Sequence, residues 1–401
     1  MRDLDALLRR GVAEIIVEEE FRRLLLSGRS LRFKLGLDPS CPDIHLGHAV
    51  VLRKLRRFQE MGHKVILIIG DWTAQIGDPT GAQATRPVLS RDEVLANART
   101  YLDQFFKIVD PERTEIRWQS EWYDRFTLSD MISLARKFTV AQLLSREDFA
   151  ERMKAGRQIT LSELIYPILQ AYDSVVVRAD VECGGIDQKF NCLMGRELQR
   201  MMGVPPQQIL LTPLLRGLDG KRKMSKSLGN YIGIADPPEE MYGKVMSIPD
   251  ELIMEYFELL TDVPEEELSE MEEDLKRRRK NPMELKKRLA FEITSQFHSE
   301  EAARRAQEHF ERVFQRRELP AEAPSFALAA SRLEEKPSSL LVSILVESGL
   351  AGSRSEAKRL IRDGAVEIDG VKISQDRMPP LRDGALIKVG KHRFLKLEIT
   401  E

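Results

Sequence analysis

The sequence predicts an α/β protein: a parallel sheet with crossover helices in its first part, then a helical region and a small α+β module. Three observations support this prediction. β-Branched runs alternate with helix-like stretches over the first half, strand patterns stop at about residue 237, and short strands return near the C-terminus. Strands separated by helical patterns favour parallel pairing, and parallel sheets bind ligands beyond the carboxyl ends of their strands.

The alternating elements of the first half follow in order. Residues 32–37 and 64–69 are apolar runs that indicate buried strands, and residues 46–61 have the pattern of a helix that ends before Gly62. The elements expected after them are a helix over 92–109, a strand at 115–118, strand-like runs at 175–177 and 179–183, a helix over 188–202 and a strand over 208–212.

The second half changes character. Residues 237–317 are charge-rich and helical, and residues 318–337 contain three prolines, which indicates a linker. The last part is expected to contain helices over 340–347 and 354–362 and short strands around 366–368, 386–389 and 394–397.

The composition is that of an ordinary globular protein of 401 residues, long enough for two or three domains. With 62 Lys and Arg against 64 Asp and Glu, the formal net charge is −2, so any basic surface for nucleic acid is local. No apolar run is long enough to span a membrane, and the polar N-terminus does not resemble a signal peptide. Three cysteines without a Cys-x-x-Cys pair favour a reducing cytoplasm over a disulfide framework or a structural zinc site.

A histidine pair lies where the second expected element begins. His45, Gly47 and His48 open this helix, after a turn at Asp38-Pro39. A helix N-terminus suits a phosphate, a glycine lets a flat ring approach the backbone, and two imidazoles can donate hydrogen bonds to phosphate oxygens. Two structural histidines or a metal-binding pair are the alternatives, although no Cys or spaced carboxylate completes a metal site.

A basic motif, Lys223-Met-Ser-Lys226-Ser227, follows the strand expected at 208–212. Two lysines on a mobile loop can close on a triphosphate, whereas a solvated basic turn is the alternative for so short a cluster. The chain has neither a Gly-x-x-x-x-Gly-Lys-Ser/Thr loop nor a Gly-x-Gly-x-x-Gly fingerprint. Two distant segments, rather than one glycine-rich loop, are therefore expected to bind a nucleotide.

The two motifs carry a family resemblance. His45-Leu-Gly-His48 resembles the HIGH motif, and residues 223–227 match the KMSKS motif, of class I aminoacyl-tRNA synthetases. Further strings at 34–39, 76–81, 166–173 and 184–188 resemble bacterial tyrosyl-tRNA synthetases, in particular the branch with a KMSKS loop. The likeness covers essentially the whole chain.

The resemblance implies a domain order. The implied parts are a Rossmann-like catalytic domain over 1–232 with a dimer-forming helical insertion at about 120–160, an α-helical anticodon-binding domain over 233–318, a linker over 319–337, and a small RNA-binding module of the ribosomal-protein type over 338–401.

It also implies roles for individual residues. Tyr166, Gln170 and Asp173 share one helix face, for which an exposed polar face is the alternative from spacing alone. By resemblance, Asp173 receives the phenol of tyrosine, and phenylalanine would leave this acceptor unpaired. The implied tyrosine-binding residues are Asp78, Tyr166, Gln170, Asp173, Gln188 and Lys34. The implied ATP-binding residues are Gly36, Asp38, Gly47, Gly185, Asp187 and Lys226. The implied catalytic residues are His45, His48, Lys223, Lys226, Ser227 and Arg86; no metal site is expected.

Two positions depart from the better-studied branch of the family. Lys34 stands where that branch has a tyrosine that helps to recognise the phenol, so recognition is expected to depend more on Asp173. Ala82 stands where a lysine is expected before Arg86. The charge of the leaving pyrophosphate is therefore expected to depend more on Arg86 and the two loop lysines.

The C-terminal module has a basic helix face. Its members are Arg354, Lys358, Arg359 and Arg362. Such a face can neutralise RNA phosphates, and a solvated helix face is the alternative. By resemblance, this module contacts tRNA and the helical domain reads the anticodon.

The resemblance implies a tyrosine–tRNA ligase. Such an enzyme activates L-tyrosine with ATP, accompanied by Mg²⁺, to tyrosyl-adenylate and pyrophosphate, and then transfers tyrosine to the 3′-terminal adenosine of its tRNA. A cytoplasmic homodimer without a membrane segment is expected. A tryptophanyl-tRNA synthetase-like enzyme is the closest alternative, and the C-terminal module and Asp173 argue against it. A non-catalytic RNA-binding paralogue is the other, and the intact histidine and lysine motifs argue against that.

Overall fold

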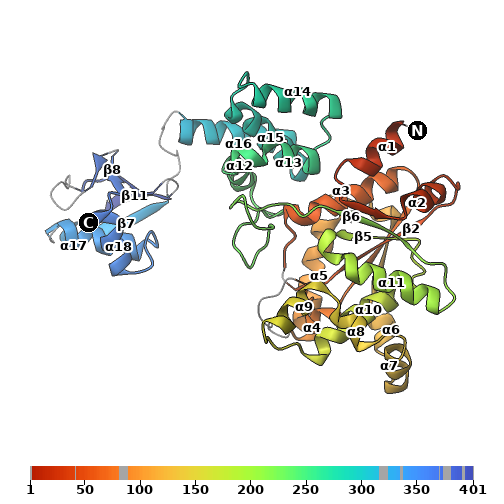
Figure 1. Ribbon diagram of the computed structural model, residues 1–401. Coiled ribbons are helices and arrows are strands. Elements are labelled where there is room, and N and C mark those ends of the chain that lie inside the picture. The colour runs from red at the N-terminus through yellow and green to blue at the C-terminus, as the bar shows by residue number, and fades with distance from the viewer. Residues whose placement is uncertain are drawn as a thin grey trace. The chain divides into compact units, whose positions relative to one another are not determined.

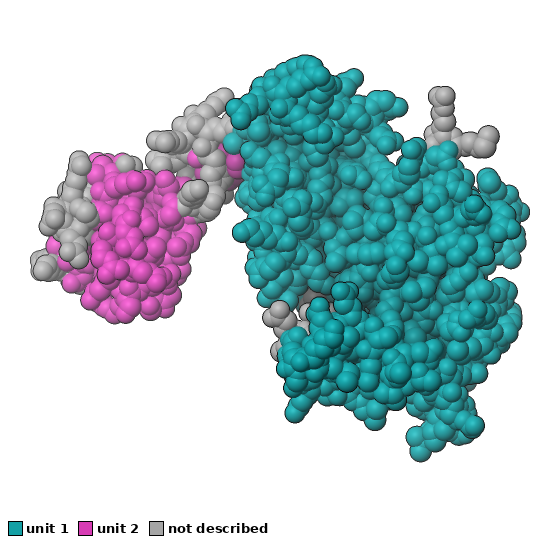
Figure 2. Space-filling model, viewed as in Figure 1, with its two compact units in different colours: residues 1–307 teal, residues 308–401 magenta. Residues whose placement is uncertain are grey.

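The computed structural model describes residues 2–40, 42–80, 89–315, 324–334, 337–369, 371–373, 381–390 and 393–400. The chain forms two compact units, Met1–Gln307 and Glu308–Glu401, which Figure 2 shows in different colours. The first unit contains both the predicted sheet and nearly all of the predicted helical domain. The second contains the C-terminal module.

A six-stranded sheet forms the centre of the first unit, with the strand order β1-β6-β5-β2-β3-β4. The strands from β6 to β4 are all parallel to their neighbours, which confirms the predicted parallel sheet. The edge strand β1 pairs antiparallel with β6 and is not among the expected elements. The strands are β1 (Glu14–Ile16), β2 (Arg32–Leu37), β3 (Lys64–Ile69), β4 (Thr114–Trp118), β5 (Val181–Gly185) and β6 (Gln208–Thr212).

The central strands are buried because helices pack on them. Every residue of β6 is buried, as is every residue of β3 after Lys64. Helix α3 (Leu46–Glu60) contacts β3 and β5, and α11 (Lys189–Met201) contacts β5 and β6. Continuous apolar runs are typical of parallel strands that are covered on both faces.

Helix α10 (Leu161–Val176) carries three of the predicted pocket residues. It begins at a capping box, in which Thr160 and Glu163 each accept a hydrogen bond from the main-chain N–H of the other. Its last turn includes Val175 and Val176, so the strand-like run expected at 175–177 was wrong. These valines continue the helix because its apolar side packs against α11.

The remaining helices of the first unit are shown in Figure 1. Those before α10 are α1 (Arg2–Arg9), α2 (Glu18–Leu25), α4 (Thr73–Ile76), α5 (Arg91–Phe105), α6 (Ser120–Tyr123), α7 (Leu128–Ala135), α8 (Val140–Leu144) and α9 (Glu147–Lys154). The predicted helical stretch after residue 237 is confirmed by α12 (Pro238–Met246), α13 (Ile253–Leu260), α14 (Glu265–Lys276), α15 (Pro282–Phe297) and α16 (Glu300–Phe310).

The residue after α1 ties the sheet region to the helical region. The guanidinium of Arg10 donates hydrogen bonds to four main-chain carbonyls between residues 257 and 263, at the end of α13. Lys54 of α3 donates to the main-chain carbonyls of Leu7 (2.7 Å) and Arg10 (2.6 Å). Helix α3, which begins with the histidine motif, is thereby connected to α13.

The second unit is a five-stranded sheet with the order β7-β11-β10-β8-β9 and two helices, α17 (Pro337–Glu347) and α18 (Arg354–Arg362). Strand β7 (Ser325–Ala329) pairs parallel with β11 (Arg393–Thr400), and Leu328 lies in the core of this unit. Residues 325–329 of the predicted linker over 319–337 therefore belong to the sheet of this unit. The other strands are β8 (Val366–Ile368), β9 (Val371–Lys372) and β10 (Leu386–Val389).

Candidate active site

Main-chain hydrogen bonds join the start of α3 to the segment that follows the lysine motif. The N–H of Leu46 donates to the carbonyl of Ile232 (2.9 Å), and the N–H of Ile234 donates to the carbonyl of Ile44 (2.9 Å). Between these bonds, His45 and Gly233 form an antiparallel bridge. Two motifs that are far apart in the sequence therefore open onto the same space.

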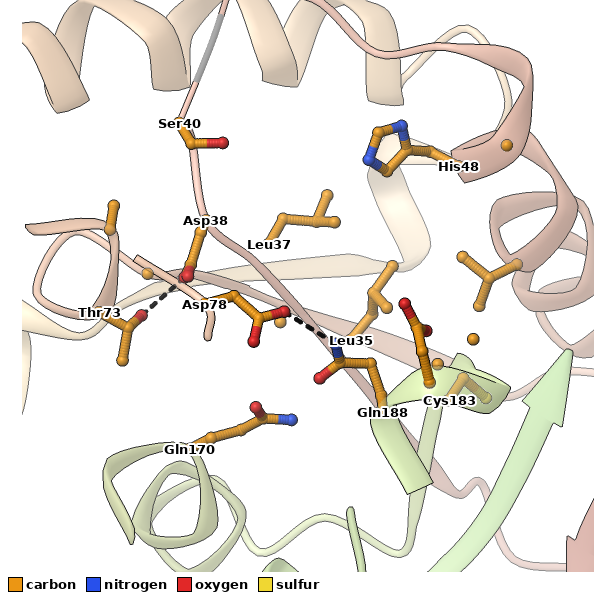
Figure 3. Close-up of a pocket in the computed structure, with 18 of the residues that line it drawn as sticks. Leu35, Leu37, Asp38, Ser40, His48, Thr73, Asp78, Gln170, Cys183 and Gln188 are labelled. Atoms are coloured by element: carbon orange, nitrogen blue, oxygen red, sulfur yellow. Dashed lines mark hydrogen bonds between the residues drawn. The ribbon is translucent and has the colours of Figure 1, made fainter. Parts of the chain in front are cut away.

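That space is a cavity of about 520 Å³ beyond the carboxyl ends of β2, β5 and β6, a size typical of small-molecule sites. It is lined by nearly all of the predicted tyrosine-binding, ATP-binding and catalytic residues. Those that line it are Gly36, Asp38, His45, Gly47, His48, Asp78, Tyr166, Gln170, Asp173, Gly185, Asp187, Gln188, Lys223, Lys226 and Ser227. Asp38, His48, Asp78, Gln170 and Gln188 are labelled in Figure 3.

The two histidines are fixed by main-chain donors. Nδ1 of His45 accepts from the N–H of Gly47 (3.1 Å), and Nδ1 of His48 accepts from the N–H of His45 (3.3 Å). Burial is the main cause that lowers the pKa of His45 to about 2 and the pKa of His48 to about 4. Since Nδ1 accepts in each neutral ring, the ring hydrogen lies on Nε2. The pair therefore offers two neutral N–H donors.

Gly47 packs closely against the ring of His45. A Cβ at this position would lie 2.9 Å from that ring, whereas its distance of 3.7 Å from Cβ of Met224 in the lysine motif would be an ordinary van der Waals contact. A side chain would therefore displace the ring of His45. Position 36, on β2, is different, because a Cβ there would meet no atom within 4 Å and would project into the cavity.

Both lysines of the basic motif are paired with carboxylates. Nζ of Lys223 lies 2.9 Å from Asp187, just after β5, and Nζ of Lys226 lies 2.7 Å from Asp43, just before α3. Asn230 holds the loop, because its side chain accepts from the N–H of Ser225 (2.8 Å) and donates to the carbonyl of Lys223 (3.1 Å). The lysines are therefore placed at the rim where the histidines lie.

One end of the cavity has an acidic character. Asp38 accepts from the hydroxyl groups of Tyr166 (2.8 Å) and Thr73 (2.7 Å), and Asp78 accepts from Nε2 of Gln188 (2.9 Å). Figure 3 shows Asp38 and Asp78 near one another. Burial and the neighbouring Asp38 raise the pKa of Tyr166, which keeps its hydroxyl as a donor. Two carboxylates at this end suit a substrate ammonium group.

Asp173 also lines the cavity and belongs to a cluster that the sequence did not indicate. It accepts from Nε2 of Gln119 (2.7 Å), Nε1 of Trp122 (3.1 Å) and the hydroxyl of Tyr123 (3.3 Å). Burial raises its pKa to about 7, against the lowering effect of Lys34 and of these donors. Gln119 also lines the cavity and was missed, because only its position after β4, a strand that ends at this edge of the sheet, could have indicated it.

Two predicted site residues do not line the described cavity. Lys34 was expected to contact tyrosine, but its side chain is fully buried behind the wall and pairs with Glu182. Its ammonium group is held instead by Glu182, Oγ of Ser174 and the main-chain carbonyl of Gln170, and the β2 residues that line the cavity are Leu35, Gly36 and Leu37, nearer the carboxyl end of the strand. Arg86, with Ala82 before it, lies outside the described residues.

The predicted RNA-binding residues lie together in the second unit. Arg354, Lys358, Arg359 and Arg362 are all exposed on α18, while Ala357 and Ile361 of the same helix are buried in the core. Four residues of the basic run at 276–280 in the first unit pair instead with acidic residues of α14: Lys276, Arg277, Arg279 and Lys280. Among the described helices, none has the length and apolar character needed to cross a membrane.

The fold, the cavity and the paired motifs define a class of protein. The family described as "tRNA synthetases class I (W and Y)" matches residues 26–315, and the S4 domain matches residues 340–378. The chain belongs to this class I family.

The relatives are more specific. The chain is 58% identical to a tyrosine–tRNA ligase of Dehalococcoides mccartyi, over 98% of each chain, and 53% identical to that of Thermotoga maritima, over 98% of this chain and 96% of the relative. A crystal structure of tyrosyl-tRNA synthetase complexed with L-tyrosine from Archaeoglobus fulgidus matches 75% of this chain and 98% of that chain, with a TM-score of 0.62 and 28% identity. Within its class, the chain belongs to the tyrosine–tRNA ligases.

Proposed function

We propose that the cavity performs both steps of the tyrosine–tRNA ligase reaction. In the first step, L-tyrosine and ATP form tyrosyl-adenylate and pyrophosphate. In the second, the 3′-terminal hydroxyl group of the tRNA attacks the carbonyl carbon of the adenylate, and AMP leaves. The observation that carries this proposal is that the histidine motif, the lysine motif and the predicted tyrosine-binding residues line one cavity.

Activation needs charge stabilisation rather than a covalent enzyme intermediate. A carboxylate oxygen of tyrosine attacks the α-phosphorus, the bond from this phosphorus to the oxygen that bridges to the β-phosphorus breaks, and pyrophosphate leaves with the electron pair. The neutral Nε2–H groups of His45 and His48 can donate to phosphate oxygens, and Lys223 and Lys226 can neutralise the leaving group.

Residues at the two ends of the cavity are proposed to select the amino acid substrate. Asp38 and Asp78 lie at the end that suits the ammonium group, and Asp173 lies at the end that suits a phenol hydroxyl. If phenylalanine bound in place of tyrosine, Asp173 would be buried without a hydrogen bond from the substrate, and this makes the binding of phenylalanine less favourable. This arrangement favours tyrosine over the tryptophan alternative, and the relatives named above are tyrosine–tRNA ligases.

Mg²⁺ is proposed to enter with ATP. Among the described residues, no three His, Cys, Asp or Glu side chains are grouped so that they could hold a metal ion. The triphosphate, rather than protein side chains, would therefore supply most of the ligands of this ion. The ion would neutralise phosphate charge, a role that it would share with Lys223 and Lys226.

A cytoplasmic homodimer is the proposed form. The predicted dimer-forming insertion at about 120–160 exposes large apolar side chains of α7, α8 and α9, such as Leu128 (76% exposed) and Val140 (62% exposed). The same segment contributes Leu134, Phe138 and Leu143 to a buried cluster. Several exposed apolar side chains over one cluster favour a protein interface. The buried free thiols of Cys183 and Cys192 are compatible with a reducing compartment.

ATP–pyrophosphate exchange tests the assignment. We expect exchange that depends on tyrosine and is at least 100-fold slower with tryptophan, because Asp173 would meet no phenol. Lys226→Ala should lower the exchange rate about 100-fold, the effect of removing one group that stabilises a developing charge.

Lys221→Ala is the matched control, because Lys221 is an exposed lysine of the same loop region that does not line the cavity. Its exchange rate should equal that of the unchanged protein. Faster exchange with tryptophan than with tyrosine would overturn the substrate assignment. Unchanged exchange in Lys226→Ala would overturn the role of the loop.

A further inference from the structure

A buried ion pair lies at the back of the tyrosine pocket, where Glu182 is one of the lining residues and Lys34 is not. Nζ of Lys34, on β2, lies 2.8 Å from Oε1 of Glu182, on β5, and the two residues are 0% and 1% exposed. Burying two charges costs several kcal/mol per ion before their attraction is counted, so such a pair is weak evidence for stability alone. Its place behind the pocket suggests a role in the reaction instead.

The pair is linked to helix α10 by a set of hydrogen bonds. Lys34 also donates to Oγ of Ser174 (2.7 Å) and to the main-chain carbonyl of Gln170 (3.1 Å). The second oxygen of Glu182 accepts from Ser174 (3.2 Å) and from the side chain of Gln207. Strands β2 and β5 are thus bound to the turn of α10 that carries Gln170 and Asp173.

The neighbouring helix leaves room for this set of side chains. A Cβ at Gly195, on α11, would lie 2.8 Å from Nε2 of Gln207, 2.9 Å from Oγ of Ser174 and 3.2 Å from Glu182. A residue with a side chain at this position would displace the hydrogen-bonded groups. The space behind the pocket is therefore shaped for them.

The pair fixes the orientation of Gln170. Nε2 of this side chain donates to Oε1 of Glu182 (3.2 Å), which leaves the amide oxygen as its free acceptor. Figure 3 shows the side chain extending from α10 into the cavity. An oxygen, rather than an NH₂ group, is the atom that can accept from the ammonium group of a substrate.

The pair also acts on Asp173 through charge. The groups that face Asp173 are Lys34 from β2, Glu182 from β5, Tyr123 and Trp122 from α6, Gln119 after β4 and Tyr166 on its own helix. Lys34 lowers the pKa of Asp173, and Glu182 raises it. The fraction of Asp173 that is ionised near neutral pH depends on the balance of the two.

We propose that Lys34 and Glu182 are positioning residues for tyrosine, which hold the amide of Gln170 in its accepting orientation and set the charge of the carboxyl group that receives the phenol. The proposal rests on the proposed function of the cavity. Neither residue touches the reacting atoms. In this chain, the lysine that replaces a phenol-binding tyrosine acts on the same substrate group from behind the wall.

Tyrosine binding measured by calorimetry across pH 5.5–9, without ATP, tests the proposal. The unchanged protein should bind tyrosine more tightly as the pH rises through about 7, where Asp173 ionises. Lys34→Met removes the charge that favours ionisation, so its binding curve should move to higher pH and its Kd at pH 7 should rise about tenfold. Glu182→Gln keeps the size of the side chain and one acceptor oxygen but removes the opposing charge, so its curve should move to lower pH.

A purely structural role gives a different result. It would weaken binding in both variants without moving either curve along the pH axis, and that result would overturn the proposal, as would shifts in the same direction. Lys54→Met is the control for the loss of a buried lysine, since Lys54 is 8% exposed and bonds only main-chain carbonyls of the α1 region. It should lower the melting temperature and leave the pH curve in place.

The same samples separate this inference from the function itself. Tyrosine-dependent ATP–pyrophosphate exchange by the unchanged protein supports the function independently of Lys34. In Lys34→Met the KM for tyrosine at pH 7 should rise while the KM for ATP stays constant. Equal increases in both would overturn the assignment to the tyrosine pocket.

Discussion

A single carboxyl group, Asp173, carries an electrostatic cost in the folded protein. Its pKa is raised from the model-compound value of 3.8 to about 7, mainly because it is buried. Because the folded state holds this proton more tightly than the unfolded state does, the proton stabilises the folded state. This stabilisation is complete below pH 4 and is lost as the pH rises through 7. Under the proposed function this cost has a use, because an ionised acceptor makes a stronger hydrogen bond to a phenol than a neutral one does.

Replacement of Asp173 by Asn should therefore stabilise the protein at pH 8. The expected gain in the free energy of unfolding is on the order of 2–4 kcal/mol, because the amide needs no ionisation. Urea unfolding at several pH values measures it. The two proteins should have similar stability near pH 4, and tyrosine-dependent exchange should be lost. A constant difference from pH 4 to 8 would contradict the ionisation argument.

At the residue scale, contacts across the fold are what the sequence could not supply. The pairing of Lys34 with Glu182 joins β2 to β5 over 148 positions, and nothing near either residue indicates it. The donors to Asp173 come from the segment after β4 for the same reason. By contrast, the cavity-lining positions of His45, His48, Lys223 and Lys226 agree with the motifs, because each lies at a loop or helix start that a short string can indicate.

At the element scale, the loop after β6 depends on one side chain. Asn230 is 4% exposed and bonds to the main chain of Ser225 and of Lys223 and to the carboxylate of Asp219. The Asn230 side chain is uncharged and does not line the cavity. Its role is to hold the two lysines of the loop in one arrangement.

Replacement of Asn230 by Ala should release the loop. We expect kcat for exchange to fall 10- to 100-fold and the KM for ATP to rise, because the lysines lose their preorganised position. Calorimetric tyrosine binding should be unchanged, since the pocket lies on other elements. Weaker tyrosine binding in this variant would show that the disturbance spreads beyond the loop.

Elements with a clear pattern of apolar residues could be predicted from the sequence, and very short elements could not. The strands β2, β3 and β6 and the helix α3 agree with the apolar patterns of the sequence. Strand β1 has only three residues, too few to show an alternation, and its pairing with β6 is a long-range contact. Residues 175–177 show the opposite error, because β-branched residues favour strands locally while the packing of α10 on α11 makes them helical.

At the scale of the whole molecule, the proposed function assigns different steps of the reaction to the two compact units. The cavity belongs to the first unit and the basic face of α18 to the second. Activation uses only small substrates, whereas transfer also needs a bound tRNA. Changes in α18 should therefore separate the two steps.

The double variant Lys358→Ala/Arg359→Ala tests this division. Exchange should stay within twofold of the unchanged protein, while the KM for tRNA in aminoacylation should rise about tenfold or more, as two phosphate contacts are lost. Raising the salt concentration should reduce the difference between the two proteins. Arg382→Ala is the control on the same unit, because Arg382 is exposed but pairs with Asp369. An equal loss in both variants would contradict a role specific to α18.

The carboxylates that hold the loop lysines change what an inhibitor of this enzyme would have to offer. A neutral adenosine mimic can fill the cavity and leave the pairs Lys223–Asp187 and Lys226–Asp43 intact. An anionic mimic of the phosphates must compete with both carboxylates, and each partly exposed pair that it replaces subtracts up to about 1 kcal/mol from its gain. An inhibitor should thus gain more affinity from contacts at the buried tyrosine end of the cavity than from added negative charge. A neutral polar group that leaves Asp43 paired should retain more of its affinity at high salt than a phosphate does.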